Sequence, residues 1–157
     1  MKSNNGKVVI ITGATRGIGL EIAKKYVKSG AKVFVGARKI TTDLEKLGHA
    51  AYFIKTDVRD YGQMKNFFKK TLSIAKRIDI YINNAGISIW KSIKNADEIF
   101  WNNVIDTNLK GCFFGCKLAA ENLKSGGVII NIASLAGKRG SKNNSVYVAS
   151  KFGVVGL

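Results

Sequence analysis

The feature that most constrains the fold is a glycine-rich turn near the N-terminus, between a strand-like run and a helical pattern. Val8 to Thr12 is a continuous apolar run, typical of a strand buried on both faces. It continues into Thr12-Gly13-Ala14-Thr15-Arg16-Gly17-Ile18-Gly19, in which the glycines form a G-x-x-x-G-x-G pattern. Glycine permits the tight turn and lets the backbone approach a pyrophosphate, and the N-terminus of the following helix offers free N–H groups. This context predicts a dinucleotide site.

Strand-like runs alternate with helical patterns along the rest of the chain. Further strands are expected at residues 32–36, 51–55, 78–82 and 128–132. Helical spacing is found at residues 18–27, where Gly30 ends the helix, and at residues 43–47, 60–72 and 97–123. A last helix has begun by Tyr147. This alternation predicts an α/β fold: a Rossmann-type doubly wound parallel sheet in a three-layer α/β/α architecture. Such sheets bind ligands at the carboxyl ends of their strands, where the strand order reverses.

Composition and charge narrow the class of protein. A hydrophobic content of 46% predicts one globular domain over residues 1–157. No apolar run approaches the ~18 residues of a membrane-spanning helix, and the N-terminus lacks a signal peptide's apolar region. We therefore expect a cytoplasmic protein without a membrane partner. The net charge of +16 raises nucleic-acid binding as an alternative. Because the basic residues are scattered in runs no longer than two, a solvated surface without a nucleic-acid partner is favoured.

The residues that most often bind metals are few in this chain. Cys112 and Cys116 stand four positions apart, a spacing that suits packing on one helix face better than a disulfide or metal site. His49 is the sole histidine, and we interpret it as a surface residue. No metal site is expected.

Two motifs together resemble the short-chain dehydrogenase/reductase family. They are the T-G-x-x-x-G-x-G turn and Asn83-Asn84-Ala85-Gly86 after the fourth expected strand. The resemblance implies that the second motif supports the sheet centre and runs along the cofactor, and that Asp57-Val58 contact adenine. The residues expected to bind the cofactor are Gly13, Thr15, Arg16, Gly17, Ile18, Gly19, Arg38, Asp57, Val58, Asn84, Ala85, Gly86, Tyr147 and Lys151.

The end of the second strand indicates which cofactor is used. NAD enzymes commonly place an acidic residue there to bind the ribose hydroxyls. Here the strand ends in Gly36-Ala37-Arg38-Lys39, which contains no carboxylate. Arg38 would attract a 2′-phosphate, and Arg16 in the glycine turn adds a second cation. The sequence therefore predicts NADP(H).

The catalytic set expected from the resemblance is Asn108, Ser134, Tyr147 and Lys151. Carbonyl reduction needs a hydride on carbon, which NADPH supplies, and a proton on oxygen. Tyr147 would supply the proton, and the Lys151 ammonium would favour tyrosinate. Ser134 would hydrogen-bond the substrate oxygen as negative charge develops. The resemblance implies that Lys151 also holds the nicotinamide ribose and that Asn108 positions a water in the proton relay.

The substrate is less well indicated than the chemistry. The resemblance favours a 3-oxoacyl-(acyl-carrier-protein) reductase, with an acyl-carrier or small-molecule carbonyl substrate. A sugar or polyol dehydrogenase, a small-ketone reductase and a non-catalytic nucleotide-binding module stay open. Residues 87–96, with Trp90, and 135–145 are expected to border the substrate. The family pattern continues beyond Leu157 with two further strands, which implies a C-terminally incomplete domain that is inactive alone and homo-oligomeric when complete.

Overall fold

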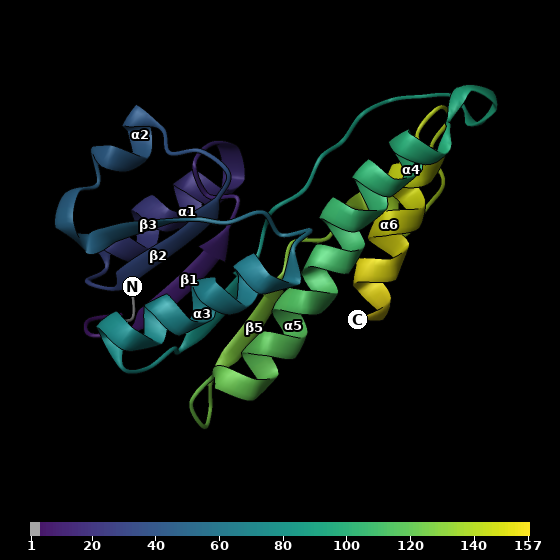
Figure 1. Ribbon diagram of the computed structural model, residues 1–157. Helices are drawn as coiled ribbons and strands as arrows, with labels where there is room; N and C mark the ends of the chain where they lie inside the picture. Colours follow the sequence, from purple (N-terminus) through teal and green to yellow (C-terminus); the bar gives the residue numbers. More distant parts are fainter. Residues whose placement is uncertain (1–3) are drawn as a thin grey trace.

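The computed structural model describes residues 4–157 as a parallel sheet with helices on both faces (Figure 1). The strands are β1 (Val8–Thr12), β2 (Lys32–Ala37), β3 (Ala51–Lys55), β4 (Ile80–Asn83) and β5 (Val128–Asn131). The α-helices are α1 (Gly17–Lys28), α2 (Thr42–Glu45), α3 (Tyr61–Ala75), α4 (Glu98–Ile105), α5 (Gly111–Asn122) and α6 (Ser145–Gly156). The strand order is β3-β2-β1-β4-β5, which reverses direction between β1 and β4. The predicted doubly wound α/β fold is confirmed.

Alternate residues of the strands supply two separate cores. Val8 and Ile10 of β1 face α3 and α5, in a cluster that includes Phe67, Phe68 and Leu118. The intervening residues of β1 face α1, in a cluster built with alternate residues of β2 and β4. Side chains on a strand alternate between faces, so a strand covered on both sides must be apolar at every position. All of β1 is buried, as the continuous apolar run predicts.

The start of α3 shows how local sequence sets an element boundary. The carboxylate of Asp60 accepts a hydrogen bond from the Gln63 backbone N–H at 3.0 Å, and the Gln63 side-chain amide donates back to it at 3.0 Å. An Asp at the N-cap satisfies one of the N–H groups that a helix start leaves unpaired. The Gln63 side-chain oxygen accepts from the Asp57 N–H at 2.9 Å, so this cap also fixes the loop after β3.

The helix expected at residues 97–123 is not uniform, which corrects the sequence interpretation. A π-helical turn, η3 (Asp106–Lys110), separates α4 from α5 without a break in the chain's direction. A π turn inserts one extra residue into the helical ladder and frequently marks a functional position. Here it contains Asn108, whose side chain is buried.

Several boundaries also differ from the expected ones. β4 begins at Ile80 instead of Ile78, β5 ends at Asn131 instead of Ile132, and α6 begins at Ser145. β5 lies at the sheet edge, with Val128 48% exposed. The long segment from β4 to α4 extends to the far end of the α4 and α6 pair, shown in green and yellow (Figure 1). There the Lys91 N–H donates to the Asn143 carbonyl at 2.8 Å, joining this segment to the loop before α6.

Candidate active site

The glycine turn connects β1 to α1 at the centre of the sheet. Gly13 and Gly17 have φ angles of 67° and 56°, a region that favours glycine. A Cβ at Gly13 would lie 2.8 Å from the Ala85 Cα, so only glycine lets this turn touch the loop after β4. The α1 N-cap residue, Arg16, makes no side-chain capping bond, and the first turn contains no acidic residue. This helix start therefore offers N–H groups and a positive dipole end to an anion.

Thr12 and Asn84 join the glycine turn to the loop after β4. The Thr12 hydroxyl oxygen accepts hydrogen bonds from the N–H groups of Asn84 and Ala85, each at 3.1 Å. The Asn84 side-chain amide donates to the carbonyls of Thr12 and Gly13 at 2.9 and 3.1 Å. The two loops thus form one rigid unit at the point where the strand order reverses, which is where sheets of this class bind ligands.

A cleft of about 820 Å³ opens over these loops, at the carboxyl ends of the strands. Every residue that the sequence assigned to cofactor binding lines it. Eleven further positions line the cleft that the sequence did not assign to the cofactor: Gly36, Ala37, Lys39, Thr41, Thr56, Arg59, Ile87, Ser88, Thr107, Ile132 and Ala133. Ile87 and Ser88 belong to the segment that was expected to border the substrate. Some of these residues, such as Lys39, Thr56 and Ile132, come just after the end of a strand, so the strand pattern could have predicted them. Others have no such signal in the sequence. Thr41 is one: its hydroxyl donates a hydrogen bond to the Thr15 carbonyl at 2.7 Å, which holds it at the cleft.

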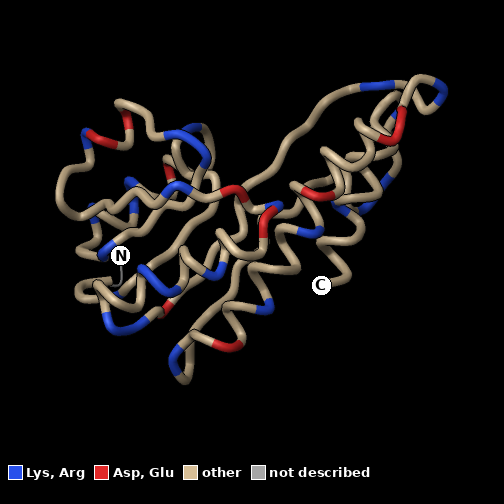
Figure 2. Tube along the Cα trace, viewed as in Figure 1, with Lys and Arg blue, Asp and Glu red and all other residues tan. Residues whose placement is uncertain are grey.

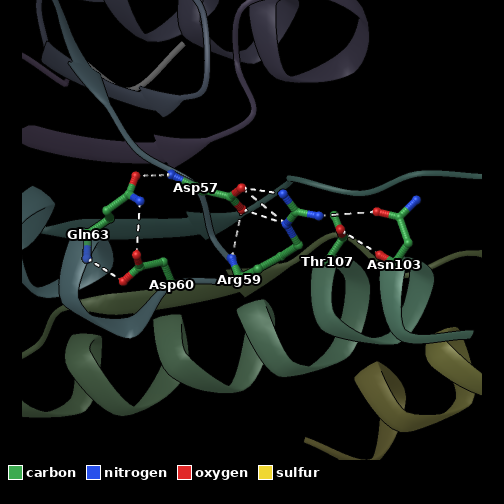
Figure 3. A network of polar contacts seen from close by, with 6 residues as sticks. All are labelled: Asp57, Arg59, Asp60, Gln63, Asn103 and Thr107. Atoms are coloured by element: carbon green, nitrogen blue, oxygen red, sulfur yellow. Dashed lines mark hydrogen bonds and ion pairs between the residues drawn. The ribbon is translucent and has the colours of Figure 1, made fainter. Parts of the chain in front are cut away.

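The end of the cleft beside β2 and β3 is rich in positive charge. Arg16 and Arg38 are exposed and have no ion-pair partner among residues 4–157. Asp57 is the one carboxylate among the described residues that line the cleft. Its carboxylate is held by the Arg59 guanidinium, as Figure 3 shows. Hydrogen bonding from Arg59 lowers the pKa of Asp57, so the Asp57 side chain is ionised at neutral pH.

The other end of the cleft contains Tyr147 and Lys151, both on α6. Their i,i+4 spacing places them on one helix face, and the Lys151 Nζ lies 5.8 Å from the centre of the Tyr147 ring. Lys151 is only 6% exposed, and its Nζ donates to the Ile132 carbonyl after β5 at 2.8 Å. Burial lowers the pKa of the Lys151 ammonium. The sheet edge therefore fixes the lysine beside the tyrosine.

Asn108 lies beneath this pair instead of in the cleft lining. Its side-chain oxygen accepts from the Ile87 N–H at 2.8 Å, and its amide donates to the Ile87 carbonyl at 2.9 Å and to the Ser150 hydroxyl at 3.0 Å. The Ser150 hydroxyl donates in turn to the Tyr147 carbonyl at 2.7 Å. A Cβ at Gly86 would lie 3.3 Å from the Asn108 oxygen and 3.8 Å from the Lys151 Nζ. These contacts make Asn108 a positioning residue that joins the β4 loop to α6.

Ser134, the remaining predicted catalytic residue, lies between β5 and α6. It precedes the short 3₁₀ helix η4 (Leu135–Gly137), and its hydroxyl oxygen accepts from the Ala136 N–H at 3.2 Å. It does not line the cleft, although the preceding residue, Ala133, does. The structure therefore brings Tyr147 and Lys151 into the cleft and leaves Asn108 and Ser134 beside it. The role of Ser134 toward a substrate oxygen stays a prediction.

The described residues contain no candidate metal cluster, and their basic residues are widely distributed along the chain. Cys112 and Cys116 are free thiols on α5. His49 is exposed, as expected from the sequence. Residues 4–157 contain no cluster of histidine, cysteine and carboxylate side chains that could hold a metal ion. Figure 2 shows lysine and arginine spread over all parts of the chain. In the described part of the chain no helix is both long and apolar enough to cross a membrane.

Comparison with known proteins identifies relatives along almost the whole chain. The sequence model of the short chain dehydrogenase family matches residues 7–157. The chain is 36% identical to a 3beta-hydroxysteroid dehydrogenase of Mediterraneibacter gnavus, over 96% of this chain and 58% of the relative. It is 35% identical to the 3-oxoacyl-(acyl-carrier-protein) reductase FabG of Chlamydia pneumoniae, over 96% of this chain and 64% of the relative.

A third relative and a solved structure extend this range. The galactitol 2-dehydrogenase of Agrobacterium fabrum is 38% identical, over 96% of this chain and 61% of the relative. A crystal structure from Sinorhizobium meliloti, described as a short-chain alcohol dehydrogenase, superposes with a TM-score of 0.90 at 33% identity, over 98% of this chain and 64% of that one. The chain thus spans less than two thirds of the length of each of these proteins.

Proposed function

Because the chain belongs to the short-chain dehydrogenase family, whose enzymes use NAD or NADP, we propose that its protein is an NADP(H)-dependent oxidoreductase that reduces a carbonyl to an alcohol. The observation that carries the proposal is the single cleft lined by all the residues expected to bind the cofactor. Three features suit a phosphorylated dinucleotide: the positive φ angles of Gly13 and Gly17, the α1 start without a side-chain cap, and Arg16 and Arg38, which have no ion-pair partner among the described residues.

The residues at both ends of the cleft fit this cofactor. The adenosine end offers Arg16 and Arg38 to a 2′-phosphate, and Asp57 and Val58 to the adenine. Gly13 to Gly19 would hold the pyrophosphate, and the Lys151 ammonium would hold the nicotinamide ribose. NADPH, when bound, supplies the hydride. The substrate carbon that accepts this hydride must then lie near Tyr147, at the opposite end of the cleft from Arg16 and Arg38.

Tyr147 is the proposed proton donor to the substrate oxygen. A free tyrosine has a pKa near ~10, which makes proton release difficult at neutral pH. The Lys151 ammonium nearby favours the tyrosinate that the transfer leaves behind. Asn108 and Ser150 fix the backbone at Tyr147, and Ser134 would stabilise negative charge on the substrate oxygen as it develops. These roles require no metal ion.

The substrate proposed first is a 3-oxoacyl group on an acyl carrier protein. Reductases of that substrate from Chlamydia pneumoniae and Staphylococcus aureus are among the relatives, and a chain of net charge +16 suits an acidic carrier. A polyol is the second candidate, because the galactitol 2-dehydrogenase has the higher identity, at 38%. Homo-oligomerisation is proposed for the whole protein, on the basis of its family.

Titration of the protein with NADPH and with NADH tests the cofactor assignment. We expect NADPH to bind at least about tenfold more tightly, or ~1.4 kcal/mol. Replacing Arg38 with alanine should remove most of that difference while NADH binding is retained. Equal affinities of the unaltered protein, or tighter NADH binding, would contradict the assignment. Oxidation of NADPH in the presence of acetoacetyl thioesters or of keto sugars would then distinguish the two substrate classes.

A further inference from the structure

Arg38 and Asp57 leave neighbouring strands at the same level of the sheet. Ala37 of β2 pairs with Lys55 of β3, and the Thr56 N–H donates to the Ala37 carbonyl at 2.9 Å. The residues that follow, Arg38 and Asp57, both line the cationic end of the cleft. Arg59 is the main cause of the low pKa of Asp57, and the Arg38 charge adds to it. An unpaired Asp57 carboxylate would attract Arg38 and repel an anionic ligand.

Arg59 engages both oxygens of that carboxylate. Its Nε lies 3.0 Å from Oδ1 and 3.1 Å from Oδ2 of Asp57, and its Nη2 lies 2.6 Å from Oδ2 (Figure 3). The Arg59 backbone N–H also donates to Oδ1 at 3.0 Å. A guanidinium fork bound to both oxygens in this way forms a strong, charge-assisted and geometrically specific ion pair. The ion pair with Arg59 therefore offsets the negative charge of Asp57, and Arg38 forms no ion pair with that carboxylate.

The guanidinium is also held from the side opposite Asp57. Its Nη1 donates to the Asn103 side-chain oxygen on α4 at 3.3 Å. The Thr107 hydroxyl, in the π turn, donates to the Asn103 carbonyl at 2.7 Å (Figure 3). The Asp57 side chain is 20% exposed and the Arg59 side chain 38%, so the pair lies partly within the protein. The bonds with Asp57 and Asn103 thus hold the Arg59 guanidinium in place without a ligand.

We infer that Arg59 is a specificity-determining positioning residue. By engaging Asp57 it leaves Arg38 unpaired for a 2′-phosphate and keeps the adenosine end of the cleft cationic. The inference rests on the proposed function, because it explains how a cleft that includes a carboxylate would still prefer the phosphorylated cofactor. It assigns Arg59 no contact with the cofactor phosphate. It also differs from a purely structural role, which would affect NADPH and NADH equally.

The test compares NADPH and NADH affinities in Arg59→Gln, Arg59→Lys, Asp57→Asn and the double variant D57N/R59Q, with thermal melting to confirm folding. We expect R59Q to lower the ratio of NADPH to NADH affinity by about three- to tenfold, because a carboxylate is released beside Arg38. R59K keeps the charge but loses the fork, so it should fall between R59Q and the unaltered protein. In the D57N background R59Q should leave the ratio unchanged, since no carboxylate remains.

Lys69→Gln is the matched control, because it removes one exposed positive charge on α3, outside the cleft. It should leave the ratio as it is. A ratio that stays constant in R59Q, even with both affinities reduced, would overturn the inference and make Arg59 merely structural. An equal loss of ratio in the D57N background would also overturn it, since Arg59 would then act on the phosphate itself. Equal affinities in the unaltered protein would instead refute the proposed function, and the inference with it.

Discussion

The side chain of Asn108 pairs with the backbone of Ile87 in both directions, as one strand pairs with another. Its oxygen accepts the Ile87 N–H at 2.8 Å and its amide donates to the Ile87 carbonyl at 2.9 Å. Because Asn108 sits in a π turn and also donates to Ser150, three distant segments meet at one buried amide. The positions of Tyr147 and Lys151 in the cleft therefore depend on the contacts of Asn108.

Replacing Asn108 with alanine should be costly in two ways. The Ile87 N–H and carbonyl and the Ser150 hydroxyl lose a buried partner, for which we expect a loss of about 2–4 kcal/mol in the free energy of unfolding. Turnover should fall by about 10²-fold in the variant that remains folded, because the backbone at Tyr147 is displaced. Denaturant unfolding and steady-state kinetics measure the two effects. Asn102→Ala, exposed on α4, is the control, and equal behaviour of the two variants would contradict the positioning role.

Sequence alone predicted many of the residues that line the cleft, because the signals that mark them are local. The run Val8 to Thr12 and the glycine turn after it are consecutive, and parallel strands bring their carboxyl ends to one edge. Residues chosen because they follow strands, such as Arg38 and Asp57, therefore line one cleft. The pairing of Arg59 with Asp57 is also short in sequence, but the anchor of Arg59 on Asn103 joins residues 44 positions apart.

The π turn is the part that sequence periodicity could not predict. Residues 97–123 show a helical apolar pattern that one extra residue barely disturbs, so the pattern predicts a single helix. The turn is stabilised by tertiary contacts of Asn108 with residues 21 and 42 positions away. Burial of Lys151 beneath the carbonyl of Ile132 likewise depends on how α6 meets the end of β5, which no local pattern encodes.

Thr12→Val should separate the two loops that form the centre of the cleft. The variant keeps the shape of the side chain but removes the oxygen that accepts the N–H groups of Asn84 and Ala85. We expect a loss of about 1–3 kcal/mol in stability and weaker binding of both NADPH and NADH, since the loop that faces the dinucleotide is released. Calorimetric titration measures this. Thr12→Ser retains the oxygen and should bind both cofactors normally. Unchanged cofactor affinity in Thr12→Val would show that binding does not depend on the Thr12 oxygen.

The ionised Asp79 carboxylate should stabilise the folded protein at neutral pH, and this stabilisation should be lost in acid. Burial raises the pKa of this carboxyl, but Arg77, the Val8 N–H and Lys124 outweigh burial and lower the pKa to about 2. A carboxyl whose folded pKa lies below its unfolded value of 3.8 stabilises the protein above that value. This stabilisation, about 2 kcal/mol, is lost as the pH falls from about 4 through about 2.

The variant Asp79→Asn tests the contribution of Asp79 to stability. The variant should be about 2 kcal/mol less stable at pH 7, and the difference from the unaltered protein should disappear toward pH 2. Urea unfolding at a series of pH values measures both. Asp43→Asn is the control, because its ion pair with Lys46 is exposed and should contribute little at any pH. A difference for Asp79→Asn that is the same at pH 7 and pH 2 would show a packing effect, not a charge effect.

Tyr147→Phe tests the proposed reaction most directly. The change removes one hydroxyl and keeps the ring that lies 5.8 Å from the Lys151 Nζ. If Tyr147 donates the proton, turnover should fall by about 10²–10⁴-fold, the usual range for general acid–base catalysis. NADPH affinity should change little, because the cationic groups and the glycine turn that line the rest of the cleft are untouched. Single-turnover oxidation of NADPH, compared with equilibrium binding of NADPH, separates the effect on turnover from the effect on affinity.

Tyr26→Phe, on α1 away from the cleft, controls for loss of a hydroxyl elsewhere. A Tyr147→Phe protein that keeps most of its turnover would assign the proton to another group.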